Sequence, residues 1–233
     1  EDQFGPALAD YDRLAELIQR RTFPRTWADA RDRLFSGENV FFGDLELSPD
    51  GLHHLKKTIA WRDVTGAVYA AGGHIFLQLQ HCGRISHPSM LPNRAVPVGP
   101  SALRPAGQAV TYAGMQDYVT PRALETQEMQ NIVVQFQRAA ELAKYAGFDG
   151  VEVHGANGYL IDQFLRDGTN LRDDAYGGSA QNRMRLLNEI LDAVCAVWPA
   201  QRVGVRFSPE NSFNSMTDSA PQAHFEYFSE QLS

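Results

Sequence analysis

The sequence predicts an α/β fold built from parallel βα units. Three short runs rich in Val, Ile, Leu and Phe, at 72–81, 148–156 and 202–209, have the composition of buried strands. Two amphipathic helical patterns separate them, at 126–147 and 182–198. Strand, helix, strand, helix and strand in alternation is typical of a parallel sheet with helices packed on it.

The segments before the first of these strands give a weaker pattern. Residues 38–51 are expected to form another strand followed by a turn, and 52–73 a helix that leads into the strand beginning at His74. Residues 1–37 form an unassigned, charged, helical N-terminal segment, so that 38–233 is expected to be one βα domain. A Pro- and Gly-rich stretch at 91–108 predicts a long loop after the first strand, and such loops usually belong to a binding face.

Composition excludes several classes of function. The chain has 233 residues and a formal net charge of −7, which argues against a nucleic-acid or anionic-membrane surface. It has no apolar run near the ~20 residues of a membrane span. Two cysteines, far apart, indicate a reducing compartment, so we expect a cytoplasmic protein. His81 and His87 lack a carboxylate or thiolate at metal-site spacing, and no metal site is predicted.

Polar side chains stand at the ends of three consecutive predicted strands: Gln78, His154 and Arg206. In parallel βα barrels, side chains at the carboxyl ends of the strands converge on the active site, whereas those in mid-strand fill the core. One such residue is most often a satisfied polar group at a strand end. Three together favour a shared site.

The residue types of this set suggest a chemistry. His154 and Asn157 can direct two donors at one carbonyl or nitro oxygen and so stabilise developing negative charge. Tyr159, protonated at neutral pH, can give a proton to a carbanion. Arg206 suits an anionic ring such as a reduced flavin, and Gln78 offers a donor and an acceptor to its imide edge. Hydride delivery to an activated double bond fits this set; without a cofactor it could support enolisation or isomerisation.

A family resemblance runs through the same residues. The stretch HGANGYLIDQFLRDGTNLRDDAYGGSAQNRMRLL, at 154–187, closely resembles the signature of the Old Yellow Enzyme family. IFLQLQHCGRISHPS, TPRALE and VGVRFSPENSFNSMTDS resemble its other landmarks in the same order. The resemblance implies a (β/α)8 TIM barrel that binds FMN non-covalently, takes hydride from NAD(P)H and reduces C=C bonds of α,β-unsaturated carbonyl or nitro compounds.

The resemblance also implies a role for each site residue. His154 and Asn157 resemble the pair that grips the substrate oxygen, Tyr159 resembles the proton donor to the α-carbon, and Gln78 and Arg206 resemble the flavin-ring contacts. These roles agree with those inferred from the residue types.

The sequence departs from the family pattern at both ends. The Met-Thr turn of the family's first strand is not found in residues 1–60, and Ser233 falls near the end of the fifth helix. We therefore expect a partial barrel of about strands 2–5, without the later loops that build the phosphate site. A half-barrel exposes strand edges, so we expect that another chain supplies the missing half, that two copies assemble, or that the chain is a degenerate or partial gene product.

Two alternatives remain open at this stage. A flavin-free descendant would keep His154, Asn157 and Tyr159 for acid–base isomerisation or cyclisation of an unsaturated carbonyl compound. A non-catalytic partner would dock on a full-length relative.

Overall fold

The computed structural model describes residues 40–42, 45–48, 51–54 and 57–232. The helical segment predicted over 1–37 lies outside them. At the centre is a three-stranded parallel sheet with the order β11-β10-β5. Its strands are β5 (Phe76–Leu79), β10 (Gly150–His154) and β11 (Val203–Arg206). The three parallel strands predicted from the sequence are therefore confirmed.

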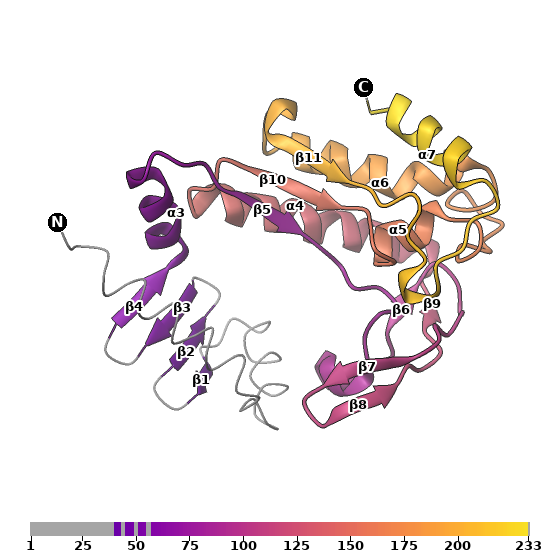
Figure 1. Ribbon diagram of the computed structural model, residues 1–233, viewed down its shortest axis with the longest axis horizontal. Helices are drawn as coiled ribbons and strands as arrows, with labels where there is room; N and C mark the ends of the chain where they lie inside the picture. The colour runs from indigo at the N-terminus through magenta and orange to yellow at the C-terminus, as the bar shows by residue number, and fades with distance from the viewer. Residues whose placement is uncertain (1–39, 43–44, 49–50, 55–56, 233) are drawn as a thin grey trace.

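One face of this sheet is covered by helices. Helices α4 (Met129–Tyr145) and α6 (Ala180–Cys195) run side by side behind the strands (Figure 1), and α7 (Pro221–Glu230) packs beyond α6. Val151 and Val153, on alternate positions of β10, are fully buried on the helix side. They join one apolar core with side chains of the three helices, including Phe136, Ala140, Leu187, Ile190 and Phe228.

Local sequence signals explain where the helices begin and end. The Ser179 hydroxyl accepts a hydrogen bond from the Asn182 N–H at 3.2 Å and caps α6, as serine does at helix starts. Beyond α4, Gly147 has a φ of +84°, a conformation that glycine adopts without a steric penalty. Both helices were predicted from apolar periodicity, and the structure confirms them with shifts of a few residues at their ends.

The prediction for 38–73 was wrong in two respects. Strands β1 (Val40–Phe42), β2 (Leu45–Ser48), β3 (Gly51–His54) and β4 (Lys57–Ala60) form a separate antiparallel sheet, so 38–51 adds no fourth strand to the parallel one. The expected helix over 52–73 is confined to α3 (Trp61–Ala70). The Asp63 carboxylate accepts from the Ala60 N–H at 3.0 Å, which places the start of the helix there.

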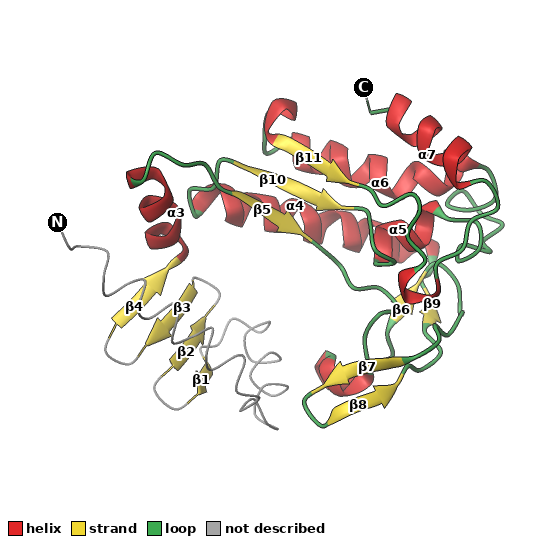
Figure 2. Ribbon diagram, in the orientation of Figure 1, coloured by secondary structure: helices red, strands yellow, loops and turns green. Residues whose placement is uncertain are grey.

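The connections after the strands are long and carry small elements (Figure 2). The predicted loop at 91–108 holds β6 (Val98–Gly99), which pairs with β9 (Arg122–Ala123). A hairpin follows, formed by β7 (Gln108–Thr111) and β8 (Gly114–Asp117). Helix α5 (Leu160–Leu165) follows β10, and single 3-10 turns include η1 (Pro88–Met90), η2 (Pro92–Arg94), η3 (Thr126–Glu128), η4 (Ala200–Arg202) and η5 (Phe213–Ser215).

Within the described ranges the strands close no barrel, and the arrangement is that of a partial βα barrel. No helix in this part of the chain combines the length and the apolar character needed to cross a membrane.

Candidate active site

The three predicted strand-end residues lie on the same face of the parallel sheet. His154 is in register with Arg206 on β11, and Gln78 on β5 is in register with Glu152, two positions before His154. Because side chains alternate along a strand, all four point away from the side that carries Val151 and Val153. The structure therefore brings Gln78, His154 and Arg206 together on the helix-free face.

His154 is buried although it is polar. Its side chain is 3 % exposed, and among the described residues neither Nδ1 nor Nε2 has a hydrogen-bond partner. Burial lowers the pKa of His154, the nearby Arg206 charge lowers it further, and Glu152 acts in the opposite direction. The ring is therefore neutral near pH 7, with one N–H donor and one acceptor nitrogen. An unsatisfied buried polar group costs about 1–3 kcal/mol, so a hydrogen bond to a ligand or a water would stabilise this ring.

The turn after β10 carries the other two predicted residues. Asn157 has a φ of +57°, which asparagine tolerates better than most residues. Its N–H donates to the Ser208 hydroxyl at 2.8 Å, and its carbonyl accepts from Asn214 Nδ2 at 2.7 Å. The tilted ring of Tyr159 lies next to His154, with 5.5 Å between the ring centroids. His154, Asn157 and Tyr159 thus belong to one turn that is fixed against the segment after β11.

A buried ion pair holds these two segments in place. Asp162 and Arg166, on α5 and just after it, are 2.8 Å apart, and their side chains are 0 % and 3 % exposed. The second Asp162 oxygen accepts from the Gly158 N–H at 2.8 Å. Arg166 donates to the carbonyls of Ser208 at 2.5 Å and Pro209 at 3.2 Å. One pair of charges therefore connects the turn that carries Asn157 to the loop after Arg206.

Sequence reasoning missed two contributors to this region. Glu152 accepts a hydrogen bond from Gln78 Nε2 at 2.5 Å, although an acidic residue between two valines normally indicates a solvated strand face. The Asp162–Arg166 pair was also missed. Its only signal was the i, i+4 spacing of opposite charges in a mostly apolar segment.

A group of possible metal ligands occurs away from this face. Asp167, Asp218 and His224 bring ligand atoms within 4.8 Å of one another. His224 Nδ1 lies 2.6 Å from an Asp218 oxygen that also accepts from the Ala220 N–H at 2.9 Å, at the start of α7. Asp167 accepts from the Ser219 N–H. These contacts fix the beginning of α7, so we assign the three residues a structural role.

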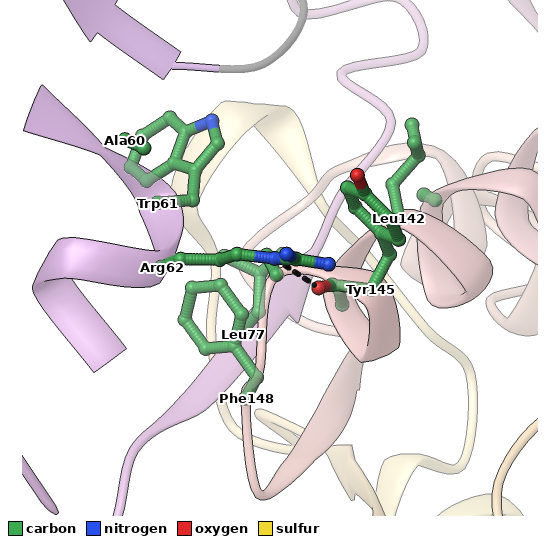
Figure 3. Close-up of a pocket in the computed structure, with 10 residues that line it drawn as sticks. Ala60, Trp61, Arg62, Leu77, Leu142, Tyr145 and Phe148 are labelled. Atoms are coloured by element: carbon green, nitrogen blue, oxygen red, sulfur yellow. Dashed lines mark hydrogen bonds between the residues drawn. The ribbon is translucent and has the colours of Figure 1, made fainter. Parts of the chain in front are cut away.

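A cavity of about 420 Å³ lies on the other side of β5, between α3 and α4 (Figure 3). Leu77 contributes to its wall, whereas the neighbouring Gln78 faces away from it. Arg62 crosses the cavity, with its guanidinium 4.1 Å from the Tyr145 ring centroid and its Nε donating to the Tyr145 carbonyl at 3.1 Å. The cavity is therefore separate from the candidate active site.

Comparison with known proteins places this arrangement in a family. A flavin oxidoreductase of Emericella nidulans is 45% identical over 172 residues, which is 74% of this chain and 44% of that protein. The 12-oxophytodienoate reductase 1 of Oryza sativa is 41% identical over 184 residues, which is 78% of this chain and 47% of the rice protein.

Solved structures agree with these matches. Morphinone reductase in complex with tetrahydroNAD superimposes with a TM-score of 0.71 at 46% identity, over 74% of this chain and 49% of that one. The Old Yellow Enzyme homologue of Zymomonas mobilis superimposes equally well, at 42% identity. The chain spans about half the length of the relatives it matches. Residues 48–233 match the model of one family, so the chain belongs to the NADH:flavin oxidoreductase / NADH oxidase family, to which its resemblance to Old Yellow Enzyme pointed.

Proposed function

We propose that this chain provides the substrate-side and flavin-side residues of an FMN-dependent ene-reductase, which reduces C=C bonds conjugated to a carbonyl or nitro group with NAD(P)H. The observation that carries the proposal is the pair of buried, unpartnered His154 nitrogens beside Tyr159, on the face that also presents Gln78 and Arg206. The relatives support the oxidoreductase class: they include a flavin oxidoreductase, a 12-oxophytodienoate reductase and a morphinone reductase.

The residues on this face fit the ring system of a flavin. Gln78 and Arg206 are exposed, so both can meet a ligand without being uncovered first. A Cβ at Gly204, next to Glu152 in the ladder, would meet no atom closer than 3.9 Å, so this part of the face is open to a flat group. An amide, a guanidinium and a neutral imidazole together match the donors and acceptors of an isoalloxazine ring. FMN bound here would supply hydride from NAD(P)H.

The protein's own side chains would then act on the substrate. The N–H of neutral His154 and the amide of Asn157 hold the carbonyl or nitro oxygen and stabilise negative charge that develops on it. Tyr159 holds a proton on its hydroxyl and delivers it to the α-carbon. Because His154 is buried, its hydrogen bond forms away from water and is stronger than an exposed one.

A comparison of Tyr159→Phe with Tyr145→Phe tests this proposal. Tyr145 is 67 % exposed and lines the separate cavity, so its variant is the control for loss of a hydroxyl. We expect the FMN-loaded protein to be bleached anaerobically by NADPH in all forms. Reoxidation by a cyclic enone should slow by about 10²–10⁴-fold in Tyr159→Phe alone. A folded protein that takes up no FMN, or equal enone rates in both variants, would contradict the proposal.

The same assays examine the alternatives. Turnover of an unsaturated carbonyl compound without flavin, abolished in Tyr159→Phe, would identify acid–base chemistry by the β10–α5 turn alone.

Among the described strands, β5 and β11 each have one unpaired edge in the parallel sheet. We therefore also propose that a second copy or a complementing chain adds a strand to this sheet. The mass of the purified protein in solution tests whether the chain associates in this way.

A further inference from the structure

We propose that Glu152 is a positioning residue: its carboxylate fixes the orientation of the Gln78 amide and so determines which edge of a ring ligand Gln78 recognises. The identity of the ring as a flavin rests on the function proposed above. The orientation of Gln78 is a property of the protein alone.

The register of the sheet creates this contact. Glu152 stands in the middle strand, opposite Gln78 on β5 and opposite Gly204 on β11. Gln78 Nε2 donates to Glu152 Oε1 at 2.5 Å. Because Gly204 has no side chain, no side chain lies directly opposite Glu152 on β11. Gln78 is therefore the only side chain directly opposite it in the described ladder.

The chemistry of the two groups makes the orientation unique. An ionised carboxylate only accepts hydrogen bonds, whereas an amide has a donor end and an acceptor end. The nitrogen of Gln78 must therefore turn toward Glu152. Its carbonyl oxygen and second N–H remain free, and the oxygen can accept from a ring N–H while the N–H donates to an adjacent ring carbonyl. Those are the two groups of a cyclic imide edge.

The strand position before this pair closes one direction to the Glu152 side chain. A Cβ at Gly150 would lie 2.4 Å from Phe76 Cε1 and 2.3 Å from the Arg202 carbonyl oxygen, so the Phe76 ring lies over this glycine. Phe76 and Gly150 are the pair that precedes Gln78 and Glu152 in the register. The Phe76 ring therefore keeps the carboxylate from folding back along β10, and the observed hydrogen bond directs it toward Gln78.

Glu152→Gln is the decisive variant, because a glutamine has nearly the same shape but can pair with Gln78 in either orientation. Glu152→Asp keeps the charge on a shorter side chain, and Glu141→Gln, on the outside of α4, removes a partly exposed charge elsewhere. We expect the Kd for FMN, measured by quenching of flavin fluorescence, to rise about tenfold in Glu152→Gln. Glu152→Asp should recover part of this loss, and Glu141→Gln should leave it unchanged.

Two readouts separate positioning from a general structural role. The visible spectrum of bound FMN should shift in Glu152→Gln, because the hydrogen bonds to the imide edge become mixed. In the flavin-free protein, the Gln78 side-chain NH₂ should give two well-dispersed proton resonances in ¹⁵N-correlated spectra, which move toward random-coil positions in Glu152→Gln only. Unchanged NH₂ resonances in that variant would overturn the inference.

The NH₂ measurement also separates the positioning role of Glu152 from the proposed ene-reductase function. If wild-type protein binds no FMN but Glu152→Gln releases the Gln78 NH₂, the proposed function fails and the positioning stands. If FMN binds equally tightly, with the same spectrum, to wild type and Glu152→Gln, the positioning fails and the proposed function stands.

Discussion

Removing one charge of the buried Asp162–Arg166 pair is expected to destabilise the protein severely. In Asp162→Asn the guanidinium of Arg166 remains buried, at 3 % exposed, and loses its 2.8 Å contact with a carboxylate. The asparagine retains one acceptor, which can serve either Arg166 or the Gly158 N–H, whereas the carboxylate served both. The substitution changes little in volume, so its effect reports the charge and the hydrogen bonds.

The magnitude follows from the burial of both partners. Breaking a buried pair by removing one partner costs about 3–5 kcal/mol, because an uncompensated charge is left in the interior. Arg166 keeps the Ser208 and Pro209 carbonyls and lies 5.0 Å from the Phe225 ring centroid, so we expect the lower half of that range. Since native proteins are stable by about 5–15 kcal/mol, this is a large part of the total.

Urea denaturation followed by circular dichroism measures this effect. The control is Glu141→Gln, which removes a carboxylate from Arg138 in a pair on α4 with side chains 66 % and 43 % exposed. Exposed helix pairs contribute about 0.3–0.5 kcal/mol, so the control should lie within about 1 kcal/mol of wild type. If Asp162→Asn loses no more stability than Glu141→Gln, the reasoning from burial is refuted.

Two further substitutions test the turn after β10. Gly158→Ala should lower the melting temperature well below that of Gly178→Ala. Both glycines have φ near +78°, but only at Gly158 would the new Cβ meet other atoms, such as Met216 Cγ at 2.8 Å. Equal losses of melting temperature would show that backbone strain alone decides. Because burial lowers the pKa of His154 below its ordinary 6.5, the unfolded state binds the proton first as the pH falls. The free energy of unfolding should therefore decline from about pH 6.5 downward more steeply in wild type than in His154→Gln, and parallel pH profiles in urea denaturation would contradict this.

The parallel unit could be predicted because its signals are local. Val151 and Val153 flank a polar residue in a short strand, and two long helical patterns follow, so the alternation of elements was visible without tertiary information. The shared face of Gln78, His154 and Arg206 followed from a general rule about strand ends. No such rule applies to 52–73, where the same apolar residues suit a helix or paired strands, and the structure has both.

The features that were not predicted depend on contacts between distant segments. Arg84 is 3 % exposed, and its guanidinium reaches the carbonyls of Leu103, Asn214 and Ser215, none of which is near it in sequence. A charged residue in a polar loop gives no sign of such burial. The partnership of Glu152 with Gln78 is similar, since it depends on which face of the sheet the helices leave open.

The candidate site is organised by three independent constraints, which explains how a chain of about half the relatives' length presents a coherent set of side chains. The strand ladder sets the spacing of Gln78, His154 and Arg206, because register fixes side chains on neighbouring strands. The Asp162–Arg166 pair ties the turn after β10 to the loop after β11 through groups that lie outside the open face. The Asn157 backbone N–H and carbonyl make the hydrogen bonds to that same loop, so its side-chain amide is not needed to hold the turn in place. None of the three constraints uses the His154 nitrogens, which are buried and without a partner among the described residues, so the ring N–H stays available for the substrate oxygen of the proposed function.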